Sequence, residues 1–94
     1  MDPKLLQLRS ELDEINQIII ELLAKRFEVT KQVGELKRDA HLPAKDPVRE
    51  KEQKEKLLLL AKEHRLNPEL IDDIFKLITT EVVENHNRLQ DPMK

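Results

Sequence analysis

The sequence contains no cysteine, tyrosine or tryptophan, and only one glycine and two phenylalanines among its 94 residues. The lack of cysteine excludes disulfide bonds and thiolate metal sites, and the scarcity of aromatic residues requires a core of Leu, Ile and Val. The longest apolar runs, such as residues 57–61, are much shorter than the roughly 20 residues of a membrane-spanning helix. The first residues also lack the apolar stretch of a secretory signal. We therefore expect a cytoplasmic protein that does not bind membranes.

Charged residues make up 38% of the chain, but the net charge is only −2. This balance gives no strongly basic surface of the kind that binds nucleic acid, although a local cluster of basic residues can still hold a small anion. The sequence has no glycine-rich phosphate loop, no HExxH motif and no pair of histidines at metal-binding spacing. We expect no nucleic-acid partner, no metal and no cofactor.

Three prolines directly follow residues that commonly cap the N-terminus of a helix. They occur in the dipeptides Asp2-Pro3, Asp46-Pro47 and Asn67-Pro68. A cap residue before a proline at the first helical position is typical of helix starts, and helix-forming residues fill the segments in between. The sequence therefore predicts a single all-α domain over residues 1–94, with helices over residues 3–40, 47–64 and 68–89 and a loop over residues 41–45. Asp91-Pro92 would end the last helix.

The first predicted helix carries a continuous apolar stripe, at steps of three and four residues. The stripe consists of Leu5, Leu8, Leu12, Ile15, Ile19, Leu22, Val29, Val33 and Leu36. A helix of about 38 residues is roughly 57 Å long, whereas a compact chain of this size is only about 30 Å across. The two shorter helices cannot cover such a stripe, and long exposed apolar surfaces mark interfaces. We therefore expect an intertwined homodimer in which the first helices of the two chains pack together.

Basic residues interrupt this apolar stripe. Arg26 follows Ile15 by eleven residues and Lys37 follows Arg26 by eleven, a spacing of about three turns that rotates the helix by only about 20°. Arg26 and Lys37 therefore share one line, about 16 Å apart along the axis, and can grip one small anion. Arg9 lies near the stripe but about 25 Å from Arg26, and so it would reach such a ligand only from a partner chain. Alternatively, each is a snorkelling or ion-paired side chain.

The two shorter helices have narrower apolar faces. We expect their inward residues to be Leu57, Leu60 and Ala61 in one helix and Ile71, Ile74, Phe75, Ile78 and Val82 in the other. Polar residues continue both faces, because Asp46 and Glu50 precede Leu57 on its line and His86 follows Val82 by four residues. Each also has a purely structural explanation: Asp46 suits an N-cap, Glu50 a first turn and His86 the C-terminal end of a helix dipole.

Four segments of the sequence, taken together, resemble the all-helical (type II) chorismate mutases. They are LRSELDEINQIIIELLAKR, VGELK, LPAKDPVREKE and LNPELIDDIFKLI, and the resemblance covers roughly residues 5–90. It implies an intertwined dimer of three-helix chains that converts chorismate, a dicarboxylate, to prephenate in the biosynthesis of phenylalanine and tyrosine. This Claisen rearrangement is unimolecular, and so the resemblance implies no acid, base, nucleophile, metal or cofactor.

The resemblance also implies roles for the residues that match the family's motifs. Arg26 matches an arginine that binds one substrate carboxylate, and Arg9 matches an arginine that reaches into the partner's site to bind the other. Lys37 matches the lysine that contacts the ether oxygen. Further substrate-binding residues are implied at Asp46, Arg49 and Glu50, the last of which holds the substrate hydroxyl.

The third helix departs from the family's pattern. Where the family commonly has glutamine or glutamate, eleven residues after Phe75, this chain has His86. Four residues earlier, at Val82, a small polar residue can contact substrate in the family. We expect His86 to donate to the ether oxygen. The alternatives are a lower rate without this donor, or a displaced helix in which Asn85 or Gln90 takes the role.

Two other functions remain open on the sequence. A lyase of the same fold eliminates pyruvate from isochorismate, and the intact VGELK and DPVRE motifs favour the mutase over it. The other alternative is a non-catalytic helical module for dimerisation or regulation, in which the basic residues are only ion-paired. A dicarboxylate that mimics the transition state would raise the melting temperature of the enzyme but not that of the module.

Overall fold

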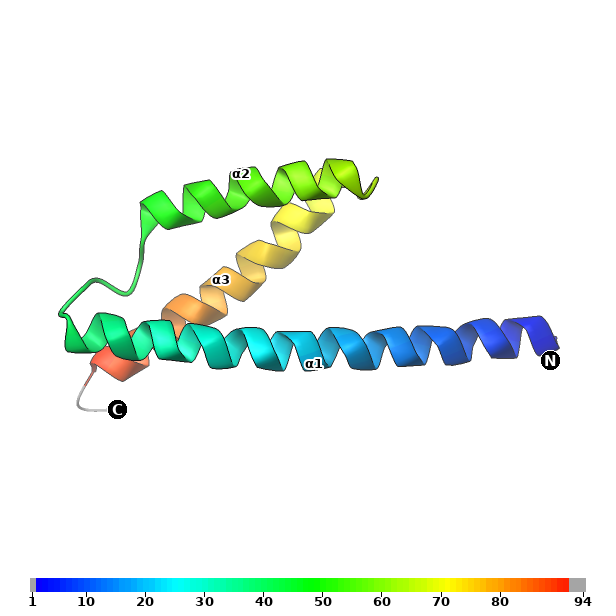
Figure 1. Cartoon of the computed structure of the whole chain (residues 1–94), viewed down its shortest axis with the longest axis horizontal. Coiled ribbons are helices and arrows are strands. Elements are labelled where there is room, and N and C mark those ends of the chain that lie inside the picture. The colour runs from blue at the N-terminus through cyan, green and yellow to red at the C-terminus, as the bar shows by residue number, and fades with distance from the viewer. Residues whose placement is uncertain (1, 92–94) are drawn as a thin grey trace. The chain divides into compact units, whose positions relative to one another are not determined.

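The computed structural model describes residues 2–91, which form three helices and no strand. Helix α1 spans Pro3–Asp39, α2 spans Pro47–Glu63 and α3 spans Pro68–Gln90 (Figure 1). The all-α prediction of three helices is confirmed, and each predicted boundary lies within one residue of the observed one. No helix in the described part of the chain is long and apolar enough to cross a membrane.

The helices start where the cap residues predicted them to start. Asp2 Oδ1 accepts a hydrogen bond from the backbone N–H of Lys4 at 2.7 Å, and Asn67 Oδ1 accepts one from that of Glu69 at 3.0 Å. Each bond satisfies a backbone donor that the first turn of a helix leaves without a partner inside the helix. At the other end, α3 stops at Gln90 with Asp91 as its C-cap. Pro92, expected to end this helix, lies outside the described residues.

Helices α1 and α2 end in the same type of turn. His41 and Arg65, the second residue after each helix, both have a φ of 57°, in the left-handed region that non-glycine residues rarely adopt. The next residue folds back in both cases, because the N–H of Leu42 bonds the carbonyl of Lys37 and that of Leu66 bonds the carbonyl of Ala61, each at 2.8 Å. These Schellman-type turns redirect the chain sharply after each helix.

The chain divides into two compact units, Met1–Thr30 and Lys31–Lys94, and the boundary falls inside α1. The nine residues of the apolar stripe on α1 are each 41–68% exposed in the single chain. The stripe predicted from the sequence is therefore exposed in the single chain. A helix gains most of its stability in proteins from packing of its apolar face, which this stripe lacks in a single chain.

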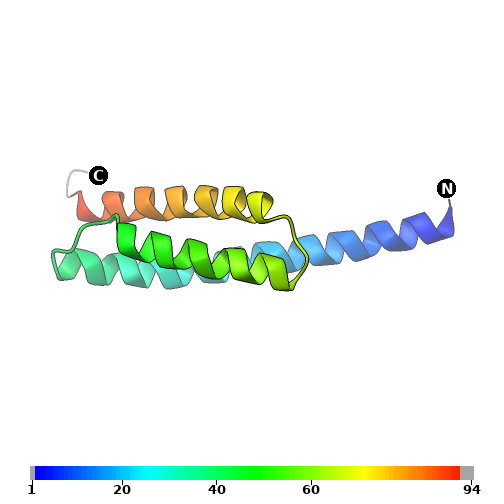
Figure 2. The same ribbon diagram turned by 90° about the horizontal axis from the view of Figure 1, so that it is seen from above.

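The second unit holds the buried part of the chain. In it α2 and α3 pack side by side and run in opposite directions (Figures 1 and 2). Its buried residues are Gly34, Ala44, Ala61 and His86. The expectation that Leu60 and Ile74 point inward is wrong for the single chain, since they are 48% and 41% exposed. Periodicity placed them on an apolar face, but no element of the single chain covers that part of the face.

Candidate functional site

The end of α1 holds Lys37 against the loop that follows it. The Nζ atom of Lys37 donates a hydrogen bond to the carbonyl oxygen of Ala44 at 3.2 Å. Lys37 is half-buried and Ala44 is buried, although the rest of this loop is largely exposed. An ammonium group has three N–H donors, so the bond to the loop uses one of them to hold the group in place and leaves two for a ligand.

One turn earlier on α1, Gly34 provides the surface on which His86 packs. His86 is only 3% exposed. A Cβ atom placed on Gly34 would stand 2.5 Å from Cδ2 and 3.0 Å from Nε2 of the His86 ring. The imidazole therefore lies directly on the backbone of α1. Because Gly34 and Lys37 are three residues apart, they lie on one face of the helix. The two predicted donors to the ether oxygen thus meet consecutive turns of α1: His86 packs on Gly34, and Lys37 is one turn further along.

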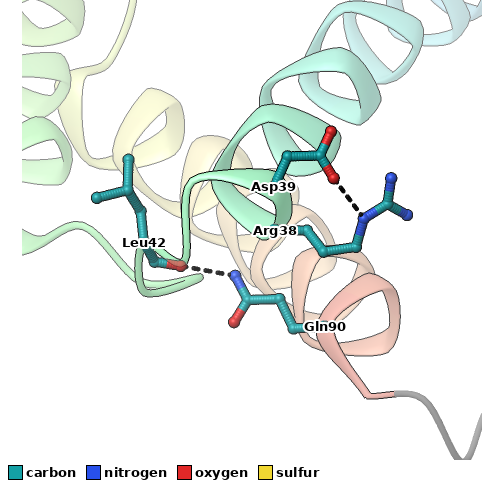
Figure 3. A network of polar contacts seen from close by, with 4 residues as sticks. All are labelled: Arg38, Asp39, Leu42 and Gln90. Atoms are coloured by element: carbon teal, nitrogen blue, oxygen red, sulfur yellow. Dashed lines mark hydrogen bonds and ion pairs between the residues drawn. The ribbon is translucent and has the colours of Figure 1, made fainter.

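The other candidates on the third helix are engaged elsewhere. Asn85 Oδ1 accepts a hydrogen bond from Arg88 Nη1 at 2.9 Å. Gln90 Nε2 donates to the carbonyl oxygen of Leu42 at 2.8 Å, and so it ties the end of α3 to the loop after α1 (Figure 3). Val82 is half-buried, one turn before His86. Of the three residues considered for the ether-oxygen donor, His86 is the buried one.

The start of α2 places the residues of the DPVRE motif. Asp46 is the N-cap, and its Oδ1 accepts a hydrogen bond from the backbone N–H of Arg49 at 3.1 Å. The structural explanation for Asp46 therefore holds, and the bond leaves its second carboxylate oxygen for another donor. Glu50 is half-buried in the first turn, while Arg49 is exposed.

A groove of about 330 Å³ runs between α2 and α3 beside Glu50, and its lining includes the apolar side chains of Leu57 and Phe75. Across it, Gln53 Nε2 donates a hydrogen bond to Thr79 Oγ1 at 3.3 Å. The sequence reasoning missed this pair. A signal was present, since Gln53 lies one turn after Glu50 and Thr79 one turn after Phe75, which puts both on inward lines.

Acidic and basic side chains line the outer part of this groove. Asp72 Oδ2 lies 3.0 Å from Lys76 Nζ and 3.8 Å from Lys54 Nζ. The hydrogen bond from Lys76 to this carboxylate, together with its negative charge, raises the pKa of the lysine. Within residues 2–91, no group of three or more histidine and acidic side chains is arranged to hold a metal ion.

Arg9 and Arg26 belong to the first unit, Met1–Thr30. Arg9 is exposed on α1 and Arg26 is half-buried. Their grouping with Lys37 around one ligand stays a prediction. In the second unit, the structure brings together Gly34, Lys37, Ala44 and His86 at the end of α1, and it places Glu50 in the groove between α2 and α3.

Comparison with known proteins identifies the family. The family model of chorismate mutase type II matches residues 8–87. A chorismate mutase of Methanocaldococcus jannaschii is 33% identical over 90 residues, which cover 96% of this chain and 87% of that protein. The bifunctional chorismate mutase/prephenate dehydratase of Escherichia coli is 35% identical over 79 residues, covering 84% of this chain and 20% of that protein. The bifunctional enzyme of Aquifex aeolicus is 45% identical over 60 residues, covering 64% of this chain and 17% of that protein. A match of this extent, to a separate mutase and to one part of longer enzymes, shows that the chain belongs to the type II chorismate mutase family of isomerases.

Proposed function

We propose that this chain catalyses the Claisen rearrangement of chorismate to prephenate, in the cytoplasm, on the route to phenylalanine and tyrosine. The family assignment supports the reaction. The observation that carries the mechanism is the association of two nitrogen donors with adjacent turns of α1: Lys37, held by the Ala44 carbonyl, and His86, packed on Gly34. The intact VGELK and DPVRE motifs favour this reaction over loss of pyruvate from isochorismate.

The rearrangement breaks the ether C–O bond and forms a new C–C bond within one molecule, and no proton is transferred. The enzyme therefore has two tasks. It holds the flexible substrate in the diaxial, chair-like conformation that reacts, which is an effect of orientation. It also stabilises the negative charge that develops on the ether oxygen, for which fixed donors are most effective because they do not reorganise during the reaction.

Each proposed site residue serves one of these tasks. Arg26 and the partner's Arg9 bind the two carboxylates, where a guanidinium group can make two parallel hydrogen bonds. Glu50 accepts a hydrogen bond from the substrate hydroxyl. Lys37 and His86 donate to the ether oxygen. The residues that complete the wall of the site are Asp46, Arg49 and Val82.

The proposed site needs two copies of the chain. Arg9 and Arg26 are seventeen residues apart on one helix, which places them about 25 Å apart along its axis. One small dicarboxylate cannot contact both in a single chain. The nine exposed apolar residues of α1 give a second copy a surface to cover. The proposal therefore includes an intertwined homodimer, in which each chain contributes a single helical domain over residues 1–94. A folded monomer at micromolar concentration in analytical ultracentrifugation would contradict it.

The test of the reaction is an assay of the purified protein with two substrates. Loss of chorismate absorbance with formation of prephenate is the expected result. Release of pyruvate from isochorismate, without turnover of chorismate, would identify the lyase instead. If neither substrate reacts and a dicarboxylate transition-state mimic leaves the melting temperature unchanged, the chain is a non-catalytic module.

A further inference from the structure

Gly34 is the only glycine of the chain, and it lies in the interior of α1. Glycine weakens a helix interior relative to alanine. Its conformational freedom does not explain this position, because Gly34 does not have a positive φ. The explanation must therefore lie in the space that a side chain would occupy.

That space is filled by the last two turns of α3. A Cβ atom on Gly34 would stand 2.5 Å from Cδ2 of His86, 3.0 Å from its Nε2 and 2.9 Å from Cδ1 of Leu89. Contacts below about 3 Å are too close for carbon atoms, whose optimal separation is about 3.5–4.0 Å. Even one methyl group here would displace the His86 ring, the Leu89 side chain or the helix that carries both.

The surroundings restrict how such a displacement can occur. His86 is only 3% exposed, so its ring is enclosed by other groups and a shift of the ring must also move its neighbours. The end of α3 is tied to the loop after α1 by the hydrogen bond from Gln90 to the Leu42 carbonyl. Helix α3 cannot move away from α1 here without loss of that bond. The His86 ring makes the closest contact, at 2.5 Å from Cδ2, so a side chain at residue 34 would shift this ring even if the Leu89 side chain moved aside.

We propose that Gly34 is a positioning residue of the active site, whose missing side chain sets the His86 ring at the depth where it acts together with Lys37 on one substrate atom. The inference rests on the proposed roles of Lys37 and His86 as donors to the ether oxygen. Lys37 lies one turn further along the same face of α1 and is held by Ala44. Helix α1 therefore positions both donors: it carries Lys37, and its backbone at Gly34 contacts the ring of His86.

The test begins with Gly34→Ala in the full chain, with turnover of chorismate as the readout. A displacement near 1 Å can lower a rate by about 10²-fold, and we expect kcat to fall by about 10- to 100-fold. KM should change by less than about threefold, because the carboxylate-binding residues are elsewhere in the site. Lys31→Ala, an exposed change on the same helix, is the matched control and should leave kcat unchanged. A Gly34→Ala protein with unchanged kcat would overturn the proposal.

Two double variants separate positioning from a general effect on folding. His86→Gln replaces the ring with a flexible amide, so that adding Gly34→Ala to it should lower kcat by less than about threefold. Leu89→Ala removes only the second contact, so that adding Gly34→Ala to it should still lower kcat about tenfold or more. If the single variant does not fold, the comparison of Leu89→Ala with and without Gly34→Ala decides, and equal kcat values would contradict the proposal.

Failure of this proposal differs from failure of the proposed function. If the unaltered protein does not convert chorismate to prephenate, the proposed function is wrong and the positioning role falls with it. If the unaltered protein is active but His86→Ala has normal kcat, His86 is not a donor. In that case the positioning role is overturned while the mutase reaction stands.

Discussion

The ammonium nitrogen of Lys37 lies 3.2 Å from the carbonyl oxygen of Ala44, to which it donates a hydrogen bond. This bond joins the last turns of α1 to the loop just before Asp46, the N-cap of α2. A lysine on a helix surface is ordinarily mobile, and fixing its side chain has an entropy cost. Here the fold fixes it before any ligand binds, which is the condition under which a donor stabilises developing charge most effectively.

Lys37→Ala should therefore lower kcat by about 10²-fold or more, as expected for the loss of one fixed donor to a developing oxyanion. The loss of the bond to Ala44 should also lower the free energy of unfolding by about 1 kcal/mol. Kinetics with chorismate, measured well below the melting temperature, separate these two effects. Near-normal turnover by the variant would remove Lys37 from the mechanism.

His86 gives a prediction about the second donor to the ether oxygen. An imidazole N–H and a side-chain amide can both donate to that atom, so His86→Gln should retain most of the activity. His86→Ala removes the donor and should lose about 10²-fold in kcat. Steady-state kinetics with chorismate measure both variants, and circular dichroism shows whether each stays folded. Normal kcat in a folded His86→Ala protein would count against the donor role.

Arg65 offers a test of stability away from the site. Its φ of 57° is strained for a residue with a Cβ, by roughly 1–2 kcal/mol, whereas glycine adopts this conformation freely. Glycine loses more entropy on folding, by about 0.5–1 kcal/mol, so Arg65→Gly should raise the free energy of unfolding by about 0.5–1 kcal/mol.

Urea denaturation at one fixed protein concentration measures this change, because the stability of a dimer depends on concentration. The control is Arg65→Ala, which keeps a Cβ at the same position and should change stability by less than about 0.5 kcal/mol. A Gly variant no more stable than the Ala variant would show that the turn does not strain residue 65.

Local signals in the sequence predicted the helices almost completely. The Asp-Pro and Asn-Pro dipeptides predicted where the three helices begin, because an N-cap residue and a proline at the first helical position affect only the first turn and need no distant contacts. The turns that end α1 and α2 were not predicted, because His41 and Arg65 adopt a left-handed conformation that usually marks glycine or asparagine.

Contacts between helices were the part that the sequence could not predict. Periodicity showed that His86 lies on an inward face, but not that it packs on Gly34. It also placed Leu60 and Ile74 inward, where the single chain leaves them exposed. A repeat of 3.6 residues identifies the apolar face of a helix, whereas the element that covers that face depends on how helices pack and, in the proposed dimer, on a second chain.

Complementation between two inactive variants tests the shared site, which is the central claim, most directly. Arg9→Ala and Arg26→Ala should each abolish most of the activity. Mixed, unfolded and refolded together at equal amounts, they should form dimers of which half contain one copy of each variant. In such a dimer one site carries both substitutions and the other carries neither, so about one quarter of the activity of the unaltered protein should return. If Arg9 and Arg26 of one chain served the same site, or if the chain acted as a monomer, mixing would restore no activity.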